Sequence, residues 1–254
     1  MDIATIGGLI LGLSAVAVGF VLEGGHLAAI FQLPAMLLVI GGTLGASMVT
    51  TSFVTFRSIP RYLAIAMRGK PRHPQRAIDQ IVKIAEHARR DGVLGLEKDL
   101  ATIADPFFRK AIQLVIDGTE VTVLTGILEN EIANVEERHH SGVILFNKMG
   151  GFAPTLGILG TVLGLIHTLA NTDDATRMAA SIASAFIATL WGVGTANLFF
   201  LPIADKLRFR HTEEMLMLNL YLEGATAIQS GDNPRIIRTK LMGFIRPEQR
   251  PPNW

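Results

Sequence analysis

Long apolar runs alternate along this chain with charged stretches of helical periodicity. The runs cover residues 3–22, 34–56, 143–170 and 179–204, and Lys148 is the only Lys, Arg, Asp or Glu within them. Each run reaches the ~20 residues that an α-helix needs to cross ~30 Å of hydrocarbon. Buried helices of a soluble core are rarely so long and so free of charge, so the pattern predicts four transmembrane helices.

Most of the charge lies in two stretches, one after the second run and one after the fourth. Between residues 57 and 142 apolar side chains recur three and four positions apart, and Asp105-Pro106 and Asp117-Gly118 predict breaks. The apolar positions Leu100, Ile103 and Phe107 belong to this pattern. Residues 121–146 keep the same period, which predicts a helix that continues into the third span.

These patterns predict an all-α membrane protein with four transmembrane helices, a helical cytosolic domain between spans two and three, and a cytosolic C-terminal tail. The predicted parts are a transmembrane hairpin (1–56), a cytosolic helical domain (57–142), a second transmembrane hairpin (143–204), and a C-terminal helix with a loose tail (205–254).

Basic residues indicate which ends of the spans face the cytosol. The residues that follow the second and fourth runs include Arg57, Arg61, Arg68, Lys206, Arg208 and Arg210. The connection 23–33 has no Lys or Arg, and the connection between spans three and four has Arg177, offset by Asp173 and Asp174. Both short connections are therefore predicted outside, and both termini in the cytosol.

Composition agrees with a membrane protein and excludes several other classes. The 254 residues are 49% hydrophobic and 18% charged, with a formal net charge of +1 and no cysteine. A charge balance so close to neutral, without a basic stripe, gives no sign of nucleic-acid binding. The absence of cysteine excludes disulfides, thiol catalysis and cysteine metal sites.

The third run contains an unusual number of helix-weakening residues, in "GGFAPTLGILGTVLGLI" at 150–166. Gly157, Gly160 and Gly164 fall on one helix face. Small residues let helices approach closely in a membrane, where lipid gives no hydrophobic reward for association. This face is therefore predicted to pack on another helix.

Two prolines, Pro154 and Pro202, remove backbone donors in the third and fourth runs. A carbonyl left without its helical partner in hydrocarbon must be satisfied by water, a hydroxyl or another helix. Nearby hydroxyls come from Thr155, Thr161, Thr189 and Thr195. A hydrated, flexible path fits these residues. Glycine and proline are common in membrane helices, however, so ordinary packing is the stronger interpretation of these residues alone.

No run carries a carboxylate or a basic group near its middle. Proteins that move ions by carrying or relaying charge usually have such a group. If this chain conducts ions, a partner must supply it.

Enzyme-like and metal-binding patterns are weak. Ser47 and His167 are predicted at opposite depths of the membrane, beyond the hydrogen-bond reach of a nucleophile and its base. Glu136, His139 and His140 are predicted to be a solvated helix face and not a metal site. No P-loop motif is present.

Over essentially its whole length, the chain resembles the MotA/PomA-type stator subunits of the bacterial flagellar motor, in the MotA/TolQ/ExbB proton-channel superfamily. The resemblance is most specific in 150–166, in "ATLWGVGTANLFFLP" (188–202) and in "ARRDGVLGLE" (88–97). It implies a non-enzymatic ion channel that converts proton or sodium flow into torque, without a cofactor other than the transported ion. Which of the two ions is used stays open.

The resemblance also implies roles for individual residues. Pro154, Thr155, Thr189 and Pro202 match the ion pathway of the family. In the cytosolic domain, the family uses an Arg and a Glu eight residues apart to engage the rotor's switch-complex protein. The matching residues are Arg89 and Glu97, with Arg90 as an alternative to Arg89.

The implied partner is a MotB/PomB-type, single-span, peptidoglycan-binding subunit whose helix carries an essential Asp. The implied assembly is a pentameric ring of this chain around a partner dimer in the bacterial inner membrane. The alternative is the related ExbB/TolQ-type energiser of outer-membrane transport, which typically has three spans. The two N-terminal spans predicted here favour the motor.

Overall fold

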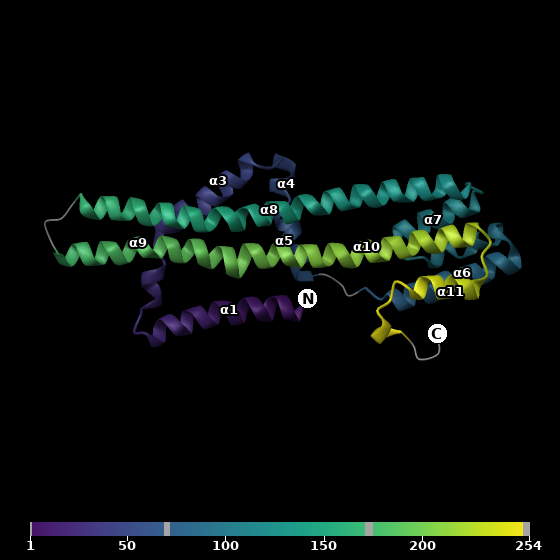
Figure 1. Ribbon diagram of the computed structural model, residues 1–254, viewed down its shortest axis with the longest axis horizontal. Coiled ribbons are helices and arrows are strands. Elements are labelled where there is room, and N and C mark those ends of the chain that lie inside the picture. The colour runs from purple at the N-terminus through teal and green to yellow at the C-terminus, as the bar shows by residue number, and fades with distance from the viewer. Residues whose placement is uncertain (1, 69–71, 171–174, 251–254) are drawn as a thin grey trace. The chain divides into compact units, whose positions relative to one another are not determined.

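The computed structural model of this chain describes residues 2–68, 72–170 and 175–250, and its regular secondary structure there is entirely helical. The chain forms two compact units. Unit 1 comprises Met1–Lys70 and His139–Arg210, and unit 2 comprises Pro71–Arg138 and His211–Trp254. Two long helices, α8 (Val121–Leu169) and α10 (Leu201–Gln229), contribute residues to both units (Figure 1). The all-α prediction is confirmed, as is the helix that begins near residue 121 and continues into the third apolar run.

Unit 1 contains the apolar runs. Its elements are α1 (Ile3–Leu22), η1 (Leu27–Ile30), α2 (Leu33–Met36), η2 (Leu37–Gly41), α3 (Gly42–Val49), α4 (Phe53–Arg57), α5 (Ile59–Arg68), the second part of α8, α9 (Ala175–Thr195), η5 (Ala196–Phe200) and the start of α10. Three helices in the described residues are long and apolar enough to cross a membrane: Ile3–Leu22, Val121–Leu169 and Met178–Gln229. The last of these runs from α9 through η5 to the end of α10. A fourth apolar helix, Leu33–Val49, is shorter. Asp173 and Asp174 of the predicted outer connection, and residues 251–254 of the predicted tail, lie outside the described residues.

The second apolar run is not one helix as far as residue 56. Its helix ends at Val49, where the hydroxyls of Thr50 and Thr51 donate to the carbonyl of Ser47 over 3.1 and 2.9 Å. The Ser52 hydroxyl then accepts from the backbone N–H of Thr55 and begins α4. Hydroxyl side chains that bond to nearby backbone groups compete with the helix and favour such a break and a new N-cap.

Two π-helical turns interrupt the regular helices of unit 1, η2 before α3 and η5 before α10. In η5, the N–H of Leu201 donates to the carbonyl of Ala196. Pro202, which has no N–H to donate, follows this turn directly. The wider π-helical turn thus accommodates the backbone hydrogen bond that is missing at Pro202. Helix α8, by contrast, continues through Pro154 without a break.

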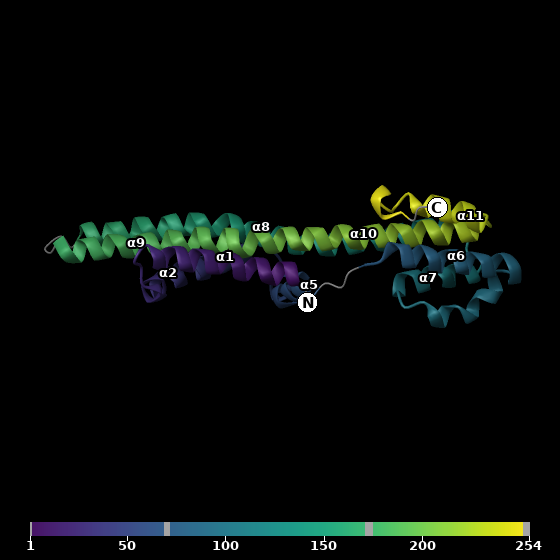
Figure 2. The ribbon, with the colours of Figure 1, turned by 90° about the horizontal axis from the view of Figure 1, so that it is seen from below.

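The N-terminal end of α1 is tied to α10 and α5, beside which it lies in both views (Figures 1 and 2). Oδ2 of Asp2 lies 2.5 Å from Nζ of Lys206 and 2.6 Å from an Arg210 guanidinium nitrogen. The backbone N–H of Asp2 donates to the carbonyl of Met67, and its side chain caps α1 at Thr5. The Lys206 hydrogen bond holds the pKa of the Asp2 carboxyl below its usual value, so this contact keeps its charge at neutral pH.

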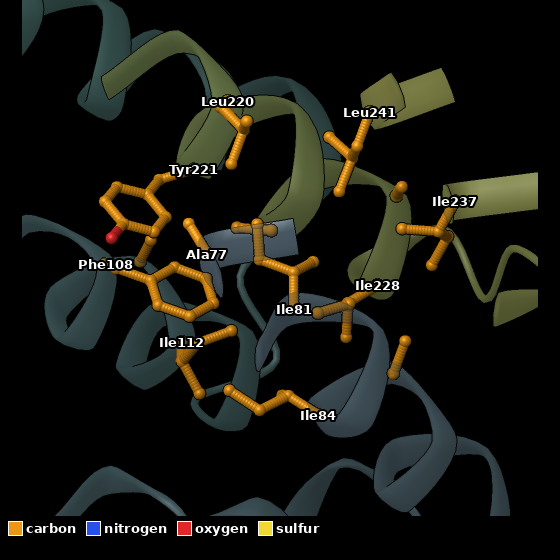
Figure 3. Close-up of a cluster of buried hydrophobic side chains, with 14 of the residues drawn as sticks. Ala77, Ile81, Ile84, Phe108, Ile112, Leu220, Tyr221, Ile228, Ile237 and Leu241 are labelled. Carbon is orange, nitrogen blue, oxygen red and sulfur yellow. The ribbon is translucent and has the colours of Figure 1, made fainter. Parts of the chain in front are cut away.

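Unit 2 is built from α6 (Pro74–Asp91), η3 (Val93–Lys98), η4 (Leu100–Thr102), α7 (Pro106–Ile116), the first part of α8, the second part of α10, α11 (Pro234–Met242) and η6 (Pro247–Gln249). Side chains from α6, α7, α10 and α11 point into one apolar cluster (Figure 3). Phe108 and Tyr221 stack there with ring centroids 4.6 Å apart. The predicted period of α6 is confirmed, because Ile78, Ile81 and Val82 are buried.

The stretch that contains Leu100, Ile103 and Phe107 is not a single helix. Leu100 lies in η4, and Asp105 accepts from the N–H groups of Phe107 and Phe108 and caps α7. The capping carboxylate followed by Pro106 starts a new helix here. The break predicted at Asp105-Pro106 is therefore confirmed, as is the turn at Asp117-Gly118, where Gly118 has φ +71°.

Candidate functional site

The glycine face of α8 lies directly against α9 (Figures 1 and 2). A Cβ built on Gly157 would lie 2.9 Å from the carbonyl oxygen of Ala188, and one on Gly192 would lie 2.5 Å from the carbonyl oxygen of Ala153. A Cβ on Gly160 or Gly164 would lie 2.6 or 2.7 Å from the Cβ of an alanine on α9. The two backbones are thus in contact at a distance that only glycine permits.

Two threonines meet at this contact. Oγ1 of Thr161 on α8 and Oγ1 of Thr189 on α9 are 2.5 Å apart. Thr161 also reaches the carbonyls of Gly157 and Ala185, each at 3.2 Å, and Thr189 reaches the Gly157 carbonyl at 3.3 Å. Hydroxyls and carbonyls therefore form a small hydrogen-bonded polar cluster between two helices whose other contacts are apolar or glycine.

The other predicted pathway residues are placed differently. Thr155 is exposed, and its hydroxyl donates to the carbonyl of Phe152 in its own helix over 2.8 Å. Pro154 is partly exposed and Pro202 is exposed. The structure therefore brings Thr189 together with Thr161 and not with Thr155.

The pairing of Thr161 was not identified from the sequence, although the signal was present. Thr161 lies four residues after Gly157 and three before Gly164, so it shares the face of the predicted glycine contact. The sequence does not show which residue of the fourth run this face meets.

A cavity of about 500 Å³ lies beside the same helices, between α8, α9 and the start of α2. Its polar lining comes from Gln32, His167, Thr168, Ser181 and Ser184. The Ser184 hydroxyl donates to Oε1 of Gln32 and so links α9 to the residue before α2. The cavity is partly open, so these polar groups line a recess in the surface of unit 1.

The predicted surface contacts of unit 2 lie around the end of α6. Arg89 and Arg90 are exposed in the last turn of α6, and Glu97 is exposed on η3. Nε of Arg90 lies 3.3 Å from the carboxylate of Asp91. Leu94 lies in the chain between the two arginines and Glu97, and it is 70% exposed. This surface carries both signs of charge around one apolar side chain.

The residues considered for catalysis and metal binding are not assembled into sites. The Ser47 hydroxyl is fully buried and has no hydrogen-bond partner in the part of the chain that the structure describes. Within that same part, no three His, Cys, Asp or Glu side chains are grouped so as to hold a metal ion.

Two family models together match most of the chain. The MotA/TolQ/ExbB proton channel family matches residues 99–219, and the motility protein A N-terminal family matches residues 6–92.

Curated relatives match over nearly the full length. "Motility protein A" of Borreliella burgdorferi is 35% identical over 98% of this chain and 96% of its own. "Chemotaxis protein PomA" of Vibrio alginolyticus is 35% identical over 98% of each chain. Among solved structures, a chain of C. jejuni MotAB has a TM-score of 0.93 at 29% identity and 98% coverage of both chains. The Bacillus subtilis flagellar MotAB stator complex has a TM-score of 0.91 at 29% identity and 96% coverage.

Proposed function

The chain belongs to the MotA/PomA family of flagellar stator subunits, and from this premise we propose how its two units convert ion flow into torque. It is an ion-channel subunit of the flagellar stator and not an enzyme. In our proposal, unit 1 lines the ion path in the membrane and unit 2 carries the contact with the rotor.

We propose that unit 1 crosses the bacterial inner membrane four times, with both termini in the cytosol. The second span in this topology is the helix Leu33–Val49, whose 17 residues are at the lower limit for a membrane-spanning helix. Arg57, Arg61 and Arg68 follow it, and Lys206 and Arg210 follow η5, which supports a cytosolic position for both of these ends.

The polar cluster of Thr161 and Thr189 is the observation that carries the proposed ion path. It is a pair of hydroxyls in contact within spans that lack carboxylates. Thr155, Pro154 and Pro202 belong to the same path in this proposal, with the prolines as points where the backbone can bend. The transported ion is a proton or sodium, and no other cofactor is required.

The missing carboxylate comes from a partner. Two of the solved structures that the chain resembles are MotAB structures, and the Bacillus subtilis one is described as a flagellar stator complex. We therefore propose a MotB/PomB-type, single-span, peptidoglycan-binding partner whose helix carries an ion-binding Asp. A multimeric ring of this chain, with five copies around a partner dimer, would surround that helix.

The rotor contact in this proposal is the exposed set Arg89, Arg90 and Glu97. Charged side chains that are exposed on a rigid unit can steer and align a partner surface of complementary charge, and salt weakens such a contact. Its partner is the switch-complex protein of the rotor.

One set of variants in motile cells tests both parts. Thr189→Val and Pro154→Ala are expected to reduce swimming together with ion flow. Arg89→Glu combined with Glu97→Lys is expected to abolish swimming while membrane insertion and ion flow are retained. Normal swimming of both pathway variants would refute the ion path, and normal swimming of the charge-reversed variant would refute the rotor contact.

The transport alternative has a different partner. An ExbB/TolQ-type energiser would co-purify with a small receptor-contacting periplasmic protein instead of a peptidoglycan-binding one. The match of residues 6–92 to the N-terminal motility protein A family and the full-length motility relatives support the motor.

A further inference from the structure

One side-chain hydrogen bond closes the turn that carries the proposed rotor contact. Helix α6 ends at Asp91, Gly92 turns the chain with φ +77°, and η3 begins at Val93. Nδ1 of His87 lies 3.0 Å from Oδ2 of Asp99, the residue that directly follows η3. The pair therefore joins the last turns of α6 directly to the far end of η3.

Other contacts hold the same turn onto unit 2. The Leu96 side chain is fully buried in the apolar cluster. The Thr102 hydroxyl donates to the carbonyl of Asp99 over 2.7 Å, and Nε of Arg109 donates to the carbonyl of Ile103 over 3.0 Å. Because the turn is attached at these points, loss of the His87–Asp99 hydrogen bond is expected to shift η3 relative to α6 and not to unfold it.

His87 and Asp99 lie close in sequence to the charged residues of the proposed rotor contact. His87 precedes Arg89 by two residues and Arg90 by three, and Asp99 follows Glu97 by two. The three contact residues are exposed, whereas the side chain of His87 is 45% exposed and that of Asp99 is 19% exposed. His87 thus lies beside the cationic residues of the rotor contact and Asp99 beside its anionic residue, and both are less exposed than the residues that they neighbour.

We propose that His87 and Asp99 are positioning residues of the rotor contact, which set the spacing between the cationic side chains of α6 and the anionic Glu97. Complementary charges steer and align partners according to their arrangement, so a change in this spacing weakens torque transfer without touching the ion path. The inference rests on the proposed rotor contact and names the residues that hold its geometry.

The test uses the full chain assembled with its partner, and it measures torque and ion flow separately. His87→Ala and Asp99→Ala are each expected to lower stall torque toward the level of Glu97→Ala, with ion flow unchanged. Asp99→Ala added to Glu97→Ala should lower torque no further, because both act on one contact. The exchanged pair, His87→Asp with Asp99→His, should restore torque relative to His87→Asp alone.

The matched control is Lys110→Ala, which removes an exposed ion pair with Glu131 elsewhere in unit 2 and should leave torque unchanged. A parallel fall of torque, ion flow and membrane level, without rescue by the exchanged pair, would show a merely structural role and overturn the proposal. Wild-type torque in both alanine variants would overturn it too. If the Arg89→Glu, Glu97→Lys protein also kept wild-type torque, the rotor contact itself would be wrong, and not only the positioning pair.

Discussion

At the residue scale, threonines of the third span that look equivalent in the sequence have different surroundings. The Thr155 hydroxyl bonds within its own helix and faces the exterior of the chain. The Thr161 hydroxyl bridges to α9 and meets Thr189. Only the second arrangement joins two helices of the proposed ion path.

Thr161→Val is therefore expected to reduce ion flow and swimming as strongly as Thr189→Val. Loss of one hydrogen bond costs roughly 1 kcal/mol, too little by itself to unfold the unit. Because the two hydroxyls act together, the double variant should be no worse than either single one. Ion flow in cells and the amount of protein in the membrane are the measurements.

Thr155→Val is the comparison within the same proposed path: its hydroxyl bonds only within α8, so this variant is expected to retain more ion flow than Thr161→Val. Equal losses in the two variants would mean that the hydroxyl contact between α8 and α9 is not what matters.

A second residue-scale prediction concerns Tyr221 in unit 2. Burial, followed by the nearby Asp105 carboxylate, raises the pKa of the Tyr221 phenol from 10.0 to about 12. A raised pKa means that the fold favours the neutral phenol. The stability that this preference contributes is complete below pH 10 and is lost as the pH rises through about 12.

The chain has two tyrosines, so a Tyr62→Phe variant isolates Tyr221. Its tyrosinate absorbance is expected to titrate near pH 12, and Tyr221→Phe should lose less stability between pH 10 and pH 12 than the parent. Titration at the ordinary value while unit 2 is still folded would contradict the burial of this phenol.

At the scale of elements, the pair α8 and α9 depends on glycines that sit against backbone atoms. A methyl group at Gly192 would lie 2.5 Å from the Ala153 carbonyl oxygen, and no flexible side chain can move aside there. The helices would have to separate, which also pulls Thr161 away from Thr189.

Gly192→Ala is expected to destabilise the protein by about 1–3 kcal/mol, the usual cost of overpacking, and to reduce ion flow. Gly151→Ala is the matched control, because its methyl group would meet nothing within 4 Å in this chain. The thermal unfolding midpoint of both variants in detergent checks the prediction. A Gly192→Ala protein as stable as the control would contradict the close contact.

At the scale of the whole molecule, the membrane unit is incomplete as an ion channel. The four apolar runs, 3–22, 34–56, 143–170 and 179–204, contain Lys148 near the start of the third but no carboxylate. The proposed ion path relies on a carboxylate that binds the ion, and the apolar runs of this chain do not contain one.

Ion flow is therefore expected to require the partner and to stop when the partner's Asp is replaced by Asn, while the complex still assembles. Co-purification reports assembly, and a change of cytosolic pH or sodium reports flow. Ion flow through this chain alone would contradict the division of labour between the two proteins.

Much of the fold could be predicted because its causes are local. Apolar runs of about 20 residues indicate membrane helices, because a helix of that length spans the hydrocarbon core. The helical period of the apolar residues from residue 121 onward predicts that α8 continues into the third run. Asp105-Pro106 and Gly118 indicate their breaks by capping and backbone conformation. The lack of carboxylates in the apolar runs is visible in the sequence alone.

By itself the sequence determined the all-α class, the family, the apolar runs and the glycine face of α8. Only the tertiary structure decided that this face meets Ala188 and Gly192, that Thr161 is the hydroxyl opposite Thr189, and that His87 reaches Asp99 across a glycine turn. It also placed the end of the second apolar helix at Val49. The physical reason is that helical periodicity assigns a residue to a face, whereas the neighbour of that face is chosen by packing among residues far apart in the chain.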